Sequence, residues 1–70
     1  MIDDDGNGWM AAARLIELLS RLPADSKISV NKSGNLVARN VGGCVIAYIS
    51  FVEGSLWWYA GDGNFDEDRS

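Results

Sequence analysis

Histidine is absent from this sequence, and cysteine occurs once, as Cys44. The commonest general base and metal ligand is therefore missing. A single thiol cannot form an internal disulfide, and with no partner base it is more typical of a small packing residue than of a nucleophile. The glycines fall in predicted turns, so no phosphate-binding loop precedes a helix. We expect no enzymatic activity, no cofactor and no metal site.

Long hydrophobic runs are also lacking. No apolar segment approaches the roughly 18 residues of a membrane span, and the acidic N-terminus is unlike a signal peptide. A chain without disulfides suits a reducing compartment, so a soluble cytoplasmic protein is predicted, with no membrane partner. Its 70 residues make one domain. That size is close to the limit below which a hydrophobic core needs a metal, disulfides or a second subunit.

The net charge of -4 is concentrated at the two ends of the chain. Three aspartates occupy positions 3 to 5, the tail after residue 61 is acidic, and the segment between them is slightly basic. Because residues 1–6 and 61–70 lack apolar periodicity, we predict mobile acidic ends that can be trimmed with little loss of stability. They are expected to keep the protein in solution, and an arm that recognises a basic partner is the alternative.

One helix and then four strands are predicted, an α+β fold. Residues 9–22 read WMAAARLIELLSRL and place Ala12, Leu15, Ile16, Leu19 and Leu22 on one side at helical spacing. Asn7 or Asp5 is the expected N-cap, and Pro23 ends the helix. β-branched and aromatic residues then predict strands over 27–31, 35–40, 44–51 and 55–60, separated by glycine-bearing turns. The expected architecture is an N-terminal amphipathic helix packed on a four-stranded antiparallel meander.

The register of this meander follows from the predicted turn lengths. Antiparallel partners share a face, and a slip of one residue would invert it. Two-residue turns at 42–43 and 53–54 would place Ile49 opposite both Leu36 and Trp58. The resulting face is wholly apolar and should be covered by the helix. Its members are Ile28, Val30, Leu36, Ala38, Val45, Ala47, Ile49, Phe51, Leu56, Trp58 and Ala60.

The opposite face is predicted to carry aromatic side chains that no helix covers. We expect the partner-binding residues there to be Trp57, Tyr59, Tyr48, Ile46 and Arg39. Three aromatic side chains of about 150 to 250 Å² each approach the largest apolar patch usual for a soluble monomer. The sequence leaves four alternatives for what covers this aromatic face. The tail can lay Phe65 across the patch, a second copy can form a homodimer, another protein can bind, or bases can stack there. Nucleic acid is the least expected, because Arg39 alone cannot supply the phosphate contacts.

A calcium loop is the one motif with ligand chemistry. Asp3, Asp5, Asn7 and Gly8 match the opening of such a loop ahead of a helix. The twelfth position is Arg14, where a bidentate glutamate is required. We keep a calcium-stabilised module only as an alternative.

In size, acidity and lack of catalytic groups the chain resembles small accessory proteins of bacteriophages, including anti-CRISPR inhibitors. The resemblance covers no motif and transfers no residue. It implies a non-enzymatic interaction protein, with an inhibitor or regulator of a larger protein assembly as its most specific form.

Overall fold

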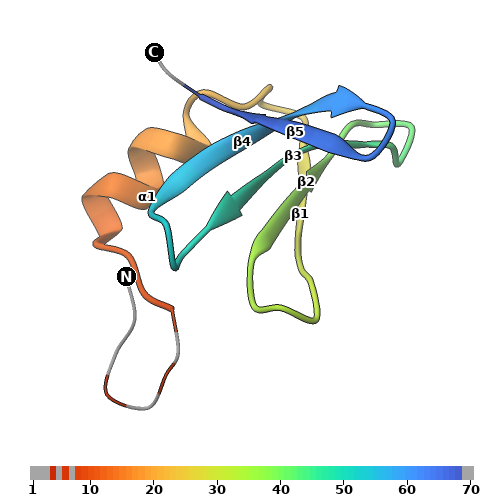
Figure 1. Ribbon diagram of the computed structural model, residues 1–70. Coiled ribbons are helices and arrows are strands. Elements are labelled where there is room, and N and C mark those ends of the chain that lie inside the picture. Colours follow the sequence, from red (N-terminus) through yellow and green to blue (C-terminus); the bar gives the residue numbers. More distant parts are fainter. Residues whose placement is uncertain (1–3, 5, 7, 69–70) are drawn as a thin grey trace.

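A computed structural model describes residues 4, 6 and 8–68 of the chain, which form one short helix and a five-stranded antiparallel sheet (Figure 1). The sheet order β1-β2-β3-β4-β5 is that of a simple meander. The predicted α+β class is confirmed, but the predicted number of four strands is wrong. The elements are α1 (Ala12–Leu19), β1 (Lys27–Val30), β2 (Leu36–Arg39), β3 (Val45–Ser50), β4 (Ser55–Gly61) and β5 (Asn64–Glu67).

The helix is shorter than the predicted range 9–22. Its first residue follows Ala11, which is extended and lacks a side-chain cap. The chain just before it is held against the β3–β4 loop, where a Cβ atom on Gly8 would lie 2.8 Å from the Cβ atom of Phe51. In the described part of the chain, no helix is long and apolar enough to cross a bilayer.

The buried side of α1 also differs from the predicted one. Leu18, which was not assigned to the apolar side, is 1% exposed, whereas Ile16, which was, is 66% exposed. Leu15 and Leu19 are half-buried against the core. The helix is therefore rotated so that Leu18 points at the sheet and Ile16 lies on its flank.

A tight turn at Asp62 and Gly63 creates the fifth strand. Both residues have positive φ angles, 53° and 82°, as a type I′ hairpin turn requires. The chain then reverses and pairs with β4, placing Phe65 opposite Tyr59 and Glu67 opposite Trp57. The backbone N–H of Asp68 donates to the Leu56 carbonyl at 2.8 Å and extends the pairing.

The β3–β4 connection is longer than the sequence analysis assumed. Ile49 pairs with Leu56, and Ala47 pairs with Trp58, so the predicted pair of Ile49 and Trp58 is wrong. The connection spans residues 51–54, and Gly54 N–H donates to Ser50 O at 2.8 Å. Because the register differs by two residues, each side chain keeps its predicted face. Trp58 accordingly packs against the core, as expected.

A β-bulge between β2 and β3 changes the faces of two residues. The register shifts after the pair Ala38 and Ala47, so that Arg39 pairs with Val45. The extra residue in β3 is Ile46, which packs against the core. Val45 instead shares the face of Arg39. The predicted faces of Val45 and Ile46 are thus exchanged.

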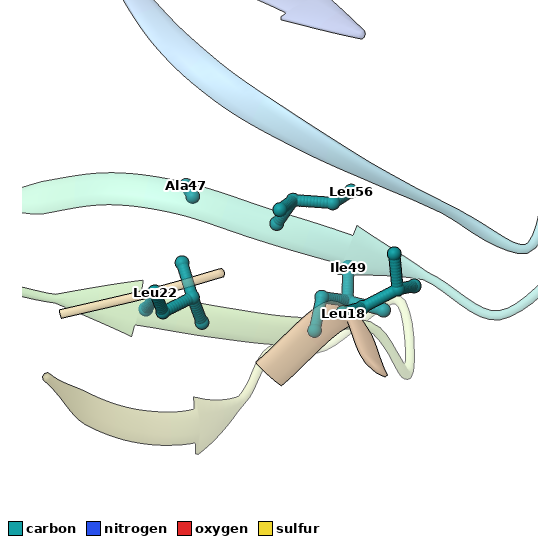
Figure 2. Close-up of a cluster of buried hydrophobic side chains, with 6 residues drawn as sticks. Leu18, Leu22, Ala47, Ile49 and Leu56 are labelled. Carbon is teal, nitrogen blue, oxygen red and sulfur yellow. The ribbon is translucent and has the colours of Figure 1, made fainter. Parts of the chain in front are cut away.

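The core lies between α1 and the middle of the sheet. Among the described residues, its buried hydrophobic members are Leu18, Leu22, Ala38, Ala47, Ile49 and Leu56. Figure 2 shows Leu18 beside Ile49 and Leu56, at the point where α1 meets the sheet. The cover does not extend to β1, where Ile28 is 43% and Val30 is 69% exposed. The prediction that the helix covers the whole apolar face is wrong at this edge, because α1 has only two turns.

Candidate partner-binding surface

Four aromatic side chains gather on the face of the sheet away from α1. We call Tyr48, Trp57, Tyr59 and Phe65 the outer aromatic cluster. The rings of Tyr48 and Trp57 are stacked, with 6.1 Å between centroids and 6° between planes. Phe65 meets Tyr48 and Tyr59 edge-on, at centroid distances of 4.9 Å and 5.2 Å. These geometries are those that aromatic pairs prefer, so the cluster is a packed unit.

The tail therefore does fold back over the aromatic face, one of the arrangements that the sequence left open. Phe65 is half-buried between two tyrosine rings because β5 pairs with β4 and turns this side chain outward. Two bonds hold the tail in place. Glu67 accepts a hydrogen bond from Ser55 Oγ at 2.9 Å, and Asp68 forms an ion pair with Arg21. Tyr59 stays 44% exposed, so the cover is partial.

The Trp57 side chain is less exposed to solvent than predicted from the sequence. Its side chain is half-buried, and its indole Nε1 is buried with no hydrogen-bond partner. An unpaired buried N–H costs desolvation energy, and stacking on Tyr48 acts in the opposite direction. Trp57 thus serves as the base of the cluster, and Tyr59 is its exposed ring.

A shallow depression lies beside the cluster. We call it the outer groove; it has a volume of about 340 Å³. Its lining residues are Asn31, Asn35, Val37, Arg39, Val45, Tyr48 and Phe65. The floor is thus aliphatic and aromatic, two amides line it, and Arg39 is the one charged residue among the lining residues.

Hydrogen bonds hold two polar side chains of the outer groove, Asn31 and Arg39. Asn31 Oδ1 accepts from the backbone N–H groups of Ser33 and Asn35, at 2.9 Å and 3.0 Å. The guanidinium of Arg39 donates to the Gly43 carbonyl at 3.0 Å. These bonds to adjacent turns orient the groups before any partner arrives, which lowers the entropic cost of binding.

The structure brings four of the five predicted site residues together. Arg39 and Tyr48 line the outer groove, and Trp57 and Tyr59 lie beside it in the aromatic cluster. Ile46 is not among them, because the β-bulge turns it to the core.

Five lining residues of the groove were not among the predicted site residues: Asn31, Asn35, Val37, Val45 and Phe65. Val45 was missed because nothing local marks the bulge. Phe65 was weighed only as a cover, although the Asp62-Gly63 pair is a recognised hairpin signal that would have placed it in a strand.

The Tyr48 phenol makes the stability of the fold depend on pH. Burial raises the pKa of Tyr48 above its ordinary value of 10.0, and the nearby carboxylate of Glu53 raises it further. A raised pKa means that the fold favours the neutral phenol. The contribution of Tyr48 to the free energy of unfolding is fully present below about pH 10. It is lost as the pH rises through the pKa of Tyr48 in the folded protein.

We expect Tyr48→Phe to flatten the alkaline fall in stability. Urea unfolding at a series of pH values across the tyrosine range measures this, with Tyr59→Phe as the matched control that keeps Tyr48. An equally steep alkaline fall in Tyr48→Phe and the wild type would show that Tyr48 does not carry the effect.

Metal binding and cysteine chemistry were the other kinds of site considered on the sequence. Within them, no group of three or more Cys, Asp or Glu side chains is placed to hold a metal ion. Asp3, Asp5 and Asn7 of the calcium motif lie outside the described residues. Cys44 is exposed, so its interpretation as a packing residue is wrong.

Comparisons with protein-family models, with curated proteins and with solved structures find no match to this chain.

Proposed function

We propose that this chain is a non-enzymatic protein-binding module that acts as a small inhibitor or regulator of a larger protein assembly. The observation that carries the proposal is the outer groove, an apolar depression beside the exposed ring of Tyr59. Aromatic residues and arginine are the side chains most enriched at the centres of protein interfaces. Small accessory proteins of bacteriophages, which the chain resembles in size and acidity, have roles of this kind.

The lining of the groove supports a partner segment of a particular kind. A floor of Val37, Val45 and Phe65 favours apolar side chains, and the amides of Asn31 and Asn35 suit the backbone groups of an extended peptide. Arg39 offers a charge-assisted bond to one carboxylate. We therefore propose that the partner presents an extended segment with apolar side chains and one acidic residue.

Selection of peptides from a random display library on the immobilised protein tests this function. Peptides that bind should share apolar residues and one acid. Arg39→Glu should weaken their binding about 30-fold, equivalent to about 2 kcal/mol for a central anchor. Val45→Lys should weaken it similarly, because it puts a charge on the groove floor. Lys32→Glu makes the same charge change on a residue outside the lining and should have little effect.

A charge swap makes the test specific. Replacing the acid of a selected peptide with lysine should restore its binding to Arg39→Glu. If no peptide binds the wild-type protein, or if Arg39→Glu and Val45→Lys leave the affinity unchanged while both stay folded, the outer groove is not the binding site.

A further inference from the structure

The sheet leaves apolar side chains uncovered at its first strand. β1 is an outermost strand (Figure 1), and all four of its residues are exposed. Ile28 and Val30 belong to the face that α1 covers elsewhere, yet they are 43% and 69% exposed. This surface is on the opposite side of the sheet from the outer groove.

The two flanks of α1 differ in chemistry. On one flank, Arg14 donates to the Gly54 carbonyl in the β3–β4 connection, and Arg21 pairs with Asp68 just after β5. The other flank carries Ile16 and Leu19, neighbours at i and i+3. The charged flank is thus already paired within the chain, and the apolar flank is not.

A depression of about 330 Å³ separates this apolar flank from β1. It is lined by Leu19, Ser20, Leu22, Pro23, Ala24, Ser26 and Ile28. The hydroxyl oxygen of Ser26 is buried there and has no hydrogen-bond partner among the described residues. Ile16, Leu19, Ile28 and Val30, which we call the β1 surface, therefore form an apolar strip with an unused polar atom at its base.

The backbone of β1 presents hydrogen-bonding groups to its open edge. The N–H of Asn31 donates to the Asn35 carbonyl at 2.9 Å, next to the pairs Val30 with Leu36 and Ser29 with Val37. In an antiparallel ladder, successive residues point their peptide groups alternately towards and away from the neighbouring strand. The peptide groups of Ile28 and Val30 consequently point away from β2, along the free edge.

The other edge of the sheet is protected from pairing with a copy of itself. β5 carries Asp66 and Glu67, and Asp68 follows it. Two such strands side by side would bring these carboxylates together, and like charges across a strand pair are destabilising. β1 has the single charge of Lys27.

We propose that a second copy of this chain pairs with β1 in antiparallel orientation, about a two-fold axis at Ser29. Ile28 of each copy then faces Val30 of the other, and each such pair exchanges two backbone hydrogen bonds. Lys27 faces Asn31, so no like charges are opposed. A shift of one residue would put these aliphatic side chains on the wrong face, which rules out such a register.

The register accounts for the exposure of Ile28 and Val30. Both sheets continue into one, both helices lie on the same side, and Ile28 and Val30 are covered by their counterparts. Ile16 and Leu19 of each helix then border the new interface. The added burial supplements a core whose buried hydrophobic side chains include two alanines, Ala38 and Ala47.

Sedimentation equilibrium over a range of concentrations tests the dimer. The wild-type protein should show a monomer–dimer equilibrium, and Val30→Lys should shift it at least tenfold towards monomer. Val30→Pro should do the same, since it removes an N–H that points to the open edge and not to β2. Val41→Lys, at a residue that is 63% exposed outside the β1 surface, should dimerise like the wild type.

A disulfide tests the register itself. Ser29→Cys in a Cys44→Ser background should cross-link two copies under mild oxidation. Residues at the axis form a non-hydrogen-bonded pair with Cα atoms about 4.5 Å apart, within the range of disulfides. Ser33→Cys in the same background, four residues from the axis, should not cross-link.

Two results would overturn the proposal. One is a wild-type protein that stays monomeric at every concentration, with no cross-link through Ser29→Cys. The other is a dimer that survives Val30→Lys but is lost in Val45→Lys, which would mean that copies meet through the outer groove.

Discussion

Replacement of Trp58 by alanine should lower the free energy of unfolding by about 3 kcal/mol. Trp58 packs against the core beside Ala47, its partner in β3, and is only partly exposed. Removing a large aromatic side chain from a core costs about 3 to 5 kcal/mol, and the partial exposure puts Trp58 at the lower end. A domain of this size has a total free energy of unfolding of about 4 to 10 kcal/mol. The substitution would therefore remove a large part of it.

The neighbouring Trp57 should respond differently to its two replacements. Trp57→Ala removes the stack on Tyr48 and should cost about 1 to 2 kcal/mol. Trp57→Phe keeps a ring in place and removes the buried Nε1 that has no partner, so it should stay within about 1 kcal/mol of the wild type. Urea unfolding followed by circular dichroism measures all three variants. Equal losses in Trp58→Ala and Trp57→Ala would contradict the assignment of the two indoles to opposite faces.

Replacement of Phe65 by alanine should cost about 2 kcal/mol and release β5. Phe65 is half-buried and contacts both Tyr48 and Tyr59, so its loss removes two edge-on ring contacts together with apolar burial. The backbone pairing of β5 with β4 would then lack its main side-chain anchor. Thermal unfolding measures the first effect, and amide exchange over residues 64–68 measures the second.

Asp66→Ala is the matched control, because Asp66 is an exposed β5 residue on the other face, opposite Trp58. It should leave both stability and exchange nearly unchanged. Amides of β5 that exchange freely in the wild-type protein would contradict this account of Phe65. Such a result would favour the mobile acidic end predicted from composition.

Much of the sheet was predictable because its local signals agree with its tertiary contacts. Glycine-bearing turns separate β-branched and aromatic segments, and the apolar alternation within β2 and β3 matches a face that is buried. The pair Leu36 with Ile49 was therefore predicted correctly. Even the misjudged β3–β4 turn left Trp58 on the right face, since side-chain direction repeats every two residues.

Other features depend on contacts that no local pattern encodes. The bulge that exchanges Val45 and Ile46 inserts one residue without any glycine or proline to mark it. The chain ahead of α1 lies close to Phe51 at Gly8, a contact between residues more than 40 positions apart. The acidic composition of the tail hid a strand in which Phe65 packs against Tyr48 and Tyr59.

The sequence by itself determined the fold class, the meander and the division of the sheet into a core face and an aromatic face. Those properties follow from side-chain periodicity and turn chemistry, which act within a few residues. Only the tertiary structure decided how far each face is covered. The helix, with two turns, reaches the middle of the sheet but leaves Ile28 and Val30 open, and β5 returns Phe65 over Tyr48. Cover depends on the relative placement of distant elements, and periodicity within a segment carries no information about that placement.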